Sequence, residues 1–391
     1  MFKDPIKIAD IVSVIKFAFV WPIAFLMRRL KKNVWLFSER ENEACDNSYW
    51  LYKYIRERNL HPNSYYVIKQ NSKHSIKILE LGNLVPFGSI KHYLIYLISR
   101  LHVSSHVDAG SPNSRITNFL ERNHLLKNKR AFIQHGVTKD KISFGYYSVS
   151  RADYFLCAAR PEFDFCVKEF GYPEGAVHLL GFPRFDQLKK CTLKTDILII
   201  PTWRSYLASV DNNSDFRKSL YFTKYQELLN EEKIISILEK HNLKLVFASH
   251  PEMNRFSKCF ESVHPRVSIV EFGNDEPSVL LNRAALLITD YSSIAFDAAY
   301  IDIPIIYYHF DYDKYRLTQH PEGFFSYEED GFGPIVNEID ALIESIRNSL
   351  IGGNESSNKY IFRRQRFFSI KDNNNCQRVF NSLFQTFTNE K

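Results

Sequence analysis

The segment 286–308 constrains the fold most strongly. An apolar run (286–289) ends in Asp290-Tyr291-Ser292-Ser293, a short helical period follows, and a second apolar run covers 303–308. An apolar run, a polar turn, a helix and another apolar run describe one βαβ unit of a parallel sheet. The helix of such a unit begins beside the carboxyl end of a strand, with unpaired backbone N–H groups and a positive dipole end. Phosphates bind at such positions, so the segment predicts an anion site.

The side chains of this turn favour a nucleotide diphosphate as the anion. Ser292 and Ser293 offer hydroxyl donors to phosphate oxygens, and Ser292 is a favoured helix N-cap. Asp290 and Asp297 would repel phosphate, so we expect them to cap the turn or to accept hydrogen bonds from a ribose or polyol. An ordinary strand-to-helix turn with a serine cap has the same sequence, and other parts of the chain must decide between the two.

Short apolar runs alternate with helix-length polar segments along most of the chain. The first series is 34–37, 65–68, 103–105, 131–133, 154–158 and 177–180, and the second is 197–200, 245–248, 267–270, 286–289 and 303–308. Strands alternating with helices predict parallel sheets, and two series predict two α/β domains. A chain of 391 residues also exceeds the size of about 250 to 300 residues at which one core stops growing.

The predicted organisation has three parts. Residues 1–32 form a membrane-associating helix, residues 33–188 a first Rossmann-like domain, and residues 189–391 a second one whose terminal helices pack at the junction. Two such domains that face a cleft place the carboxyl ends of their strands, and therefore any ligand, between them.

The net charge and the spacing of the cysteines limit the kinds of partner, metal site and disulfide that the sequence predicts. The net charge of +7 fits anionic partners such as nucleotides or phospholipid headgroups and is too small to indicate nucleic-acid binding. The six cysteines are scattered without a CxxC pair, which indicates neither a zinc site nor a disulfide framework and fits a reducing compartment.

The N-terminal segment 8–27 is largely apolar, but Asp10, Lys16 and Pro22 interrupt it. A spanning helix needs about 20 nearly uninterrupted apolar residues, and a central charge costs roughly 2.5 to 3.5 kcal/mol. A signal peptide would carry its charges before the apolar stretch. An amphipathic helix in the headgroup plane of an anionic membrane fits better, and a true span or a plain buried helix are the alternatives. The expected anchors and basic cluster are Phe17, Phe19, Trp21, Phe25, Arg28, Arg29, Lys31 and Lys32.

Two histidines follow predicted strands, one in each series. His135 precedes Gly136, where the backbone lets another molecule approach closely, and imidazole takes up a proton near neutral pH. Lys139 adds positive charge nearby. His250 lies in the equivalent position of the second series, where it could donate to a phosphate oxygen and stabilise a leaving group. A capping or core-packed role is the alternative for each.

Cations follow two further strands. Arg204 ends Pro201-Thr202-Trp203-Arg204 after the run 197–200, and its guanidinium suits phosphate. Trp203 in the same motif could stack on a base or fill the core. Arg184 lies in the turn Gly181-Phe182-Pro183-Arg184 at the domain boundary.

Taken in order, these pieces resemble the CDP-glycerol glycerophosphotransferase family. The resemblance begins at Trp35-Leu36-Phe37-Ser38-Glu39-Arg40 and Asp46-Asn47, passes through the HG, GxPR, PTWR, SHP and TDYSSxxFD motifs, and ends at Gly331-Phe332-Gly333-Pro334. It covers nearly the whole chain after the N-terminal helix. No single motif is specific, but the ordered set is.

The resemblance implies a GT-B architecture and peripheral attachment to the cytoplasmic face of the bacterial cell membrane. The implied reaction transfers glycerol phosphate or ribitol phosphate from CDP-glycerol or CDP-ribitol to a hydroxyl of a lipid-linked acceptor and releases CMP. The products would be teichoic acid or capsule polymers. A chain of this length leaves little room for further acceptor-binding modules, which favours a transferase of few units or a compact polymerase.

Residue roles follow from the same resemblance. His135 looks like the base that deprotonates the acceptor hydroxyl, and His250 like the ligand of the donor phosphate. The donor side would be formed by Ser292, Ser293, Asp290, Asp297, Thr202 and Arg204, and the acceptor side by Lys139, Glu39 and Arg184. The family commonly has HGTPLK where this chain has His135-Gly136-Val137-Thr138-Lys139, and an Arg-Gly pair is altered within 321–325, so the acceptor stays open.

The expected mechanism is in-line attack on the β-phosphorus of the CDP-alditol, assisted mainly by positioning and charge neutralisation. We expect no cofactor and no metal, because the sequence has no DxD-like carboxylate cluster. Two alternatives are a GT-B glycosyltransferase that uses a nucleotide sugar and a catalytically inactive membrane-bound scaffold of the same fold.

Overall fold

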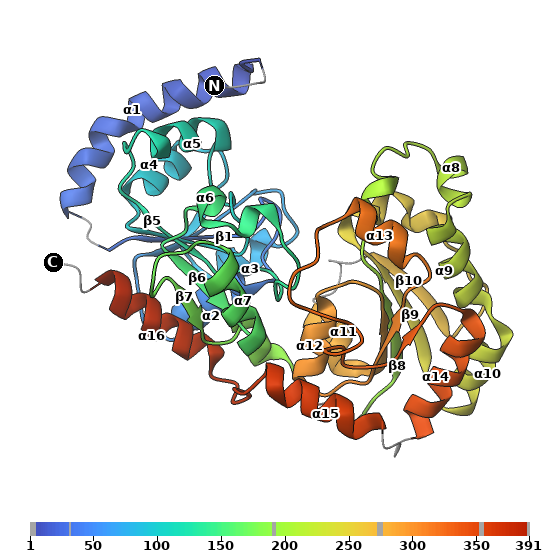
Figure 1. The fold of residues 1–391 in the computed structure, drawn as a ribbon. Coiled ribbons are helices and arrows are strands. Elements are labelled where there is room, and N and C mark those ends of the chain that lie inside the picture. Colours follow the sequence, from blue (N-terminus) through green and yellow to red (C-terminus); the bar gives the residue numbers. More distant parts are fainter. Residues whose placement is uncertain (1–4, 31–32, 190–192, 272–276, 352–355, 389–391) are drawn as a thin grey trace.

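The chain forms two parallel sheets, each flanked by helices (Figure 1). The computed structural model describes residues 5–30, 33–189, 193–271, 277–351 and 356–388. In this part of the chain the first sheet has the strand order β3-β2-β1-β4-β5-β6-β7, and the second has the order β10-β9-β8-β11-β12-β13. Neighbouring strands pair in parallel in both sheets. The predicted α/β architecture with two Rossmann-like halves is confirmed.

Among the described residues, the first half consists of seven strands and the helices that precede and connect them. Its strands are β1 (Trp35–Ser38), β2 (Ser64–Ile68), β3 (Leu84–Pro86), β4 (Leu101–Ser104), β5 (Lys129–Phe132), β6 (Tyr154–Cys157) and β7 (Val177–Leu179). Its helices are α1 (Ile8–Leu30), α2 (Asn47–Glu57), α3 (Ser75–Leu81), α4 (Ile90–Ile98), α5 (Ser114–Arg122), α6 (Tyr147–Ser150) and α7 (Arg160–Glu169), with short 3-10 turns η1 (Ser143–Gly145) and η2 (Pro183–Gln187).

The second half follows η2. Its strands are β8 (Asp196–Ile200), β9 (Lys244–Ser249), β10 (Val267–Glu271), β11 (Ala284–Thr289), β12 (Ile305–Tyr308) and β13 (Ile335–Val336). Its helices are α8 (Asn213–Arg217), α9 (Leu220–Asn230), α10 (Glu232–Lys240), α11 (Pro277–Arg283), α12 (Ile294–Tyr300), α13 (Tyr312–Thr318) and α14 (Ile339–Ile351), with 3-10 turns η3 (Ser205–Leu207) and η4 (Pro251–Cys259). The terminal helices are α15 (Ser356–Phe367) and α16 (Asn375–Thr388).

The central strands were easy to predict because they are covered on both faces. Every residue of β1, β4, β6 and β8 is buried, and strands of this kind appear in a sequence as continuous apolar runs. The sequence analysis missed β3 and β13. Both are short, and each lies at the outer edge of its sheet.

The chain crosses between the two halves a second time at its C-terminus. In Figure 1, α15 runs along the second half and α16 returns to the first. There α16 packs on α2 and η2, Phe380 lies 6.0 Å from Trp35 between ring centroids, and Ser382 accepts a hydrogen bond from Tyr154 at 3.1 Å. Most of α16 thus packs on the first half, while its first residue, Asn375, donates to the Tyr300 hydroxyl of the second half at 3.3 Å, so the last helix lies at the junction.

Helix α1 packs lengthwise on the first half. Phe17, Val20 and Ala24 are buried, and the Phe17 ring lies 4.8 Å from that of Tyr93 on α4. Two charged residues of this helix also turn to the protein, since Asp10 pairs with Arg115 at 3.2 Å and Lys16 donates to the Gly88 carbonyl, whereas Arg29 in the last turn is exposed.

The opposite side of α1 is exposed and apolar. Its exposed side chains include Ile8, Ile11, Ile15, Phe19, Ile23, Phe25, Leu26 and Leu30. Two of the expected membrane anchors are therefore wrong, because Phe17 belongs to the core and Trp21 is half-buried against it. Lys31 and Lys32 lie outside the described residues. By length and composition α1 could cross a membrane, with a mean hydropathy of 1.9 over its most apolar window.

Candidate functional site

His135 lies just beyond the carboxyl end of β5, at the edge of the first sheet that faces the second half. Gln134 takes a left-handed backbone conformation, which turns the chain at this point. The His135 ring stacks on that of His106, with centroids 4.4 Å apart and an interplanar angle of 7°. Its Nδ1 lies 3.0 Å from the carbonyl oxygen of Ser105. A carbonyl only accepts, so Nδ1 carries the proton and Nε2 of the neutral ring is the free acceptor that a general base requires.

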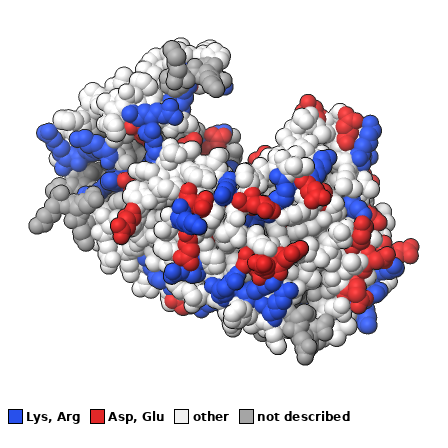
Figure 2. Space-filling model, in the orientation of Figure 1, with Lys and Arg blue, Asp and Glu red and all other residues white. Residues whose placement is uncertain are grey.

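The surroundings of His135 keep its ring neutral. His135 is exposed, and Ser293 of the second half lies against the adjacent Gly136. Figure 2 shows the molecule hollowed between the two lobes. Loss of bulk water lowers the pKa of His135, and the Asp46 carboxylate offsets part of this effect. The imidazole is therefore unprotonated at neutral pH and ready to take a proton.

The segment that carries His135 touches the predicted phosphate turn of the other half. A Cβ atom on Gly136 would lie 2.6 Å from the Ser293 Oγ and 3.1 Å from the Ser293 Cβ. Ser292 and Ser293 are both partly exposed. Ser293, directly before α12, has helical backbone angles and makes no side-chain capping bond, whereas the Ser292 Oγ accepts the backbone N–H of Ile294 at 3.4 Å, in agreement with the expected capping role of Ser292. The Ser293 hydroxyl is thus not used for capping.

His250 leaves a hydrogen-bond donor free, whereas His135 leaves an acceptor free. It follows β9, and its Nδ1 accepts the backbone N–H of Glu252 at 3.2 Å where η4 begins. The proton of the neutral ring is therefore on Nε2, which is left as a donor. Burial lowers the pKa of His250 to about 4, and the charges of Arg40 and His135 act in the same direction. His250 is a neutral hydrogen-bond donor at physiological pH.

Asn47, the first residue of α2, fixes the backbone next to His135. Its side-chain amide donates to the carbonyls of Ile133 at 3.1 Å and Gln134 at 2.8 Å. Its side-chain oxygen accepts the backbone N–H of Arg184 at 3.1 Å. One buried side chain thus ties the His135 segment to the boundary turn η2.

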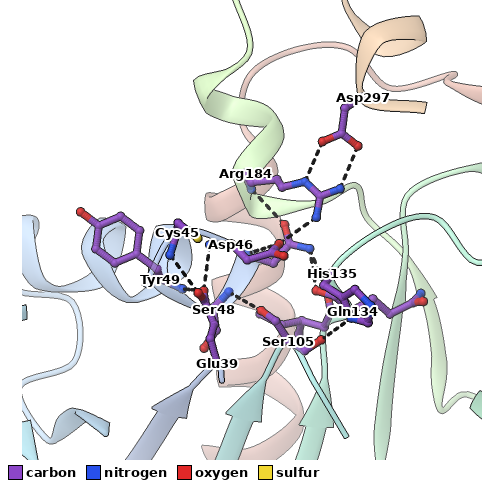
Figure 3. Close-up of polar contacts among 12 residues, drawn as sticks. Glu39, Cys45, Asp46, Ser48, Tyr49, Ser105, Gln134, His135, Arg184 and Asp297 are labelled. Atoms are coloured by element: carbon purple, nitrogen blue, oxygen red, sulfur yellow. Dashed lines mark hydrogen bonds and ion pairs between the residues drawn. The ribbon is translucent and has the colours of Figure 1, made fainter. Parts of the chain in front are cut away.

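Arg184 joins the two halves through its guanidinium (Figure 3). It pairs with Asp46 at 2.7 Å and binds Asp297 on α12 with two hydrogen bonds of 2.8 Å. Asp297 is buried and fully engaged in this pair. The predicted acceptor contact of Arg184 and the predicted polyol contact of Asp297 are both replaced by this ion pair, because a buried carboxylate requires a counter-charge.

Glu39 does not face an acceptor either. It is buried and accepts the backbone N–H groups of Cys45, Asp46 and Tyr49 at 2.8 to 3.0 Å, so it holds the start of α2 in place. Burial, together with the nearby Asp46 carboxylate, raises the pKa of Glu39 to about 8. The predicted acceptor role of Glu39 is therefore wrong, and its role is to position Asp46 and Asn47.

Arg204 is fully buried, and carboxylates of the second half surround its guanidinium. Its guanidinium binds Asp311 with two hydrogen bonds of 2.7 and 3.0 Å, lies 2.8 Å from Asp290, and donates to the Thr202 carbonyl. Asp290 in turn accepts the backbone N–H of Thr202 at 2.8 Å. The PTWR and TDYSS motifs thus fasten the ends of β8 and β11 together through Arg204 and Asp290. The Thr202 hydroxyl has no hydrogen-bond partner among the described residues, and its phosphate contact stays a prediction.

Lys139 is also engaged inside the protein. It is buried and pairs with Asp140, which binds Arg316 on α13 of the second half at 2.8 Å. This is a second ionic link between the halves, in addition to that of Arg184. Lys139 is thus held by a carboxylate, as Arg184 is, and its acceptor contact stays a prediction.

Two residues that the sequence analysis did not single out lie beside these histidines. His106 stacks on His135, and Arg40 is exposed two residues after β1. Both follow strand ends, which is the only signal that the sequence offered. Among the described residues no group of three or more His, Cys, Asp or Glu side chains has an arrangement that could hold a metal ion, and metal independence stays a prediction.

Comparison with known proteins places this site in a family. Residues 21–385 match the family described as CDP-Glycerol:Poly(glycerophosphate) glycerophosphotransferase. The minor teichoic acid biosynthesis protein GgaB of Bacillus subtilis (strain 168) is 30% identical over 371 residues, which is 92% of this chain and 40% of that protein. A teichoic acid glycerol-phosphate transferase of Staphylococcus aureus (strain NCTC 8325 / PS 47) is 28% identical over 197 residues, covering 49% of this chain and 46% of that one. The chain spans less than half the length of these curated relatives.

A solved structure shares the fold. The wall teichoic acid polymerase TagF superposes with a TM-score of 0.68 at 17% identity, covering 98% of this chain and 99% of that one. This likeness identifies the two halves as a GT-B-like fold. The family match extends over nearly all of the chain and includes the two strand-end histidines and the serine turn. The chain therefore belongs to the CDP-glycerol:poly(glycerophosphate) glycerophosphotransferase family.

Proposed function

We propose that the protein transfers glycerol phosphate or ribitol phosphate from a CDP-alditol to a hydroxyl of a lipid-linked acceptor and releases CMP, in the synthesis of teichoic acid or a related capsule polymer. Family membership supports the class of reaction. The observation that carries the proposal is the pair of neutral histidines at the facing strand ends. His135 leaves Nε2 as an acceptor, and His250 leaves Nε2 as a donor.

The two histidines have different roles in the proposed reaction. His135 takes the proton of the acceptor hydroxyl while that oxygen attacks the β-phosphorus of the donor in line. The new bond joins the acceptor oxygen to phosphorus, and the bond from the β-phosphorus to the bridging oxygen breaks, so the electron pair leaves with CMP. His250 donates to a phosphate oxygen, and the hydroxyls of Ser292 and Ser293 are available to do the same. Positioning and charge stabilisation supply most of the rate in such transfers.

The proposed location is the cytoplasmic face of the cell membrane. Asp10 and Lys16 of α1 bind the protein, while the apolar outer face of the helix is exposed along its length. A helix of this kind lies in the membrane surface, whereas a spanning helix would have to leave the domain on which α1 packs. Alkaline carbonate should strip the protein from membranes. Resistance to carbonate and to high salt would support a span instead.

The test of the activity is CMP release by the purified protein. CDP-glycerol, CDP-ribitol and UDP-sugars are supplied in parallel, each with and without an acceptor extracted from membranes. Acceptor-dependent CMP release from a CDP-alditol is expected and would name the donor. UDP release from a nucleotide sugar, with both CDP-alditols silent, would make the protein a glycosyltransferase. Silence with every donor would favour an inactive scaffold.

A further inference from the structure

Most of the positively charged side chains around the two histidines form ion pairs with carboxylates of the protein. A diphosphate donor brings negative charge that spreads further as the bond to CMP breaks, and a transferase needs cations or donors to meet it. Four cations near the site already have carboxylate partners within hydrogen-bond distance. They are Arg184 with Asp46 and Asp297, Arg204 with Asp290 and Asp311, Lys139 with Asp140, and Arg316 with Asp140.

Arg40 is held much more loosely. Its side chain is 46% exposed, and its ion-pair partner Glu43 lies 3.4 Å away, three residues along the chain. Exposed pairs of this kind contribute about 0 to 1 kcal/mol, so little free energy is needed to release the guanidinium.

The register of the first sheet places Arg40 next to the histidines. Strands β1, β4 and β5 are adjacent, and Ser38 pairs with Ser104, which pairs with Phe132. Arg40 and His106 each lie two residues beyond this row, and His135 lies three residues beyond it. The three side chains therefore emerge from neighbouring strand ends on one edge of the sheet.

The charge of Arg40 reaches across to the second half. It lowers the pKa of His106 and His135 in its own half and that of His250 in the other. The guanidinium thus acts electrostatically on the proposed base and on the proposed phosphate donor at the same time, and the transferring phosphoryl group has to lie between these two.

We propose that Arg40 is the cation that binds the transferring phosphoryl group, with its guanidinium leaving Glu43 to pair with the diphosphate of the donor. The planar fork of arginine matches two phosphate oxygens, whereas lysine supplies a point charge. This inference rests on the proposed function and assigns to an exposed residue the role that the sequence suggested for the buried Arg204.

The experiment compares Arg40→Gln and Arg40→Lys with a matched control. Arg217 at the end of α8 is also exposed and also lies 3.4 Å from a carboxylate, that of Glu261, at the outer side of the second half (Figure 1). Arg217→Gln therefore removes an equivalent surface ion pair away from the histidines. Dissociation constants for CDP-glycerol, CDP-ribitol and CMP are measured by calorimetry, and melting temperatures check that each variant is folded.

Arg40→Gln should weaken binding of the CDP-alditol that the wild type uses by about 10- to 100-fold, the range for a hydrogen-bonded charged group. Arg40→Lys should fall between Arg40→Gln and the wild type, and Arg217→Gln should match the wild type. CMP binding should change less, because CMP lacks the phosphoryl group that is transferred. NMR titration should also show a higher pKa for His250 in Arg40→Gln, because the positive charge that lowers it is gone.

Two results would overturn the inference. If Arg40→Gln binds the CDP-alditol as the wild type does, while the wild type turns it over, the inference fails and the proposed function stands. If the wild type neither binds nor turns over a CDP-alditol, the proposed function fails and takes this inference with it.

Discussion

Replacing Gly136 with alanine tests whether the two halves meet at the site as described. The new Cβ would lie 2.6 Å from the Ser293 Oγ and 3.1 Å from the Ser293 Cβ. Carbon atoms in contact prefer about 3.5 to 4.0 Å, so the Ser293 hydroxyl must rotate away and the His135 segment and the serine turn must separate by roughly 0.4 Å or more. The backbone at Gly136 is not in the left-handed region, so the penalty comes from contact alone.

The expected effect is large on turnover and moderate on stability. A displacement of about 1 Å at reacting groups can cost about 100-fold in rate, whereas overpacking one site typically costs about 1 to 3 kcal/mol of unfolding free energy. The kcat of Gly136→Ala should thus fall much further than its melting temperature suggests.

The control is the double variant Gly136→Ala with Ser293→Gly, which removes both atoms that the new methyl group meets. Its unfolding free energy should recover towards that of Ser293→Gly alone, which a double-mutant cycle by denaturant titration measures. Additive losses, or a Gly136→Ala variant with unchanged kcat, would refute the contact between the His135 segment and Ser293.

Three further predictions concern stability, pH and the membrane. Arg204→Met leaves two buried carboxylates without their counter-charge, so denaturant titration should show a loss of about 3 to 5 kcal/mol, against less than about 0.5 kcal/mol for Arg217→Met; a small loss in both would contradict the buried pair. Burial lowers the pKa of His92 to about 4, below its unfolded value of 6.5, so its contribution is present above pH 6.5 and is lost as the pH falls towards 4. Protonation of His92 should therefore reduce the free energy of unfolding by about 2 kcal/mol at pH 5, and His92→Gln should flatten this pH dependence. An equal slope in both proteins would contradict the assignment. Phe25→Glu on the exposed face of α1 should reduce sedimentation with membranes at an unchanged melting temperature, whereas Phe17→Glu should lower that temperature; equal effects would contradict the orientation of the helix.

The sheet architecture was predictable because its central strands are buried on both faces and are visible as apolar runs in the sequence. The edge strands β3 and β13 are only three and two residues long, too short to be recognised as separate apolar runs. The sequence pattern also predicted the position of α1 in the chain but not which face of the helix packs on the protein. Phe17 was therefore assigned to the membrane although it packs on Tyr93.

The histidines of the site were predictable from their positions at strand ends, but the partners of the cations were not. Arg184 and Asp297 are 113 residues apart in the chain, and Arg204 and Asp311 are 107 apart. Nothing local indicates that a buried carboxylate will meet these guanidinium groups. The sequence therefore suggested phosphate ligands at two places where the fold uses arginine to hold elements together.

The last motif of the resemblance is explained by backbone contacts. A Cβ on Gly331 would collide with the carbonyl of Tyr327, and one on Gly333 with that of Ile305. Glycine at these positions lets the chain pack against β12 before it enters β13. The motif thus supports the fold of the second half.

The most direct test of the central claim compares the wild type with His135→Asn. CMP release from the CDP-alditol is measured with acceptor present, and binding of the same donor is measured by calorimetry. Loss of a general base costs about 100- to 10,000-fold in rate, so turnover should fall by that factor while donor affinity stays unchanged. Retained turnover, or a parallel loss of turnover and donor binding, would contradict the assignment of His135 as the base.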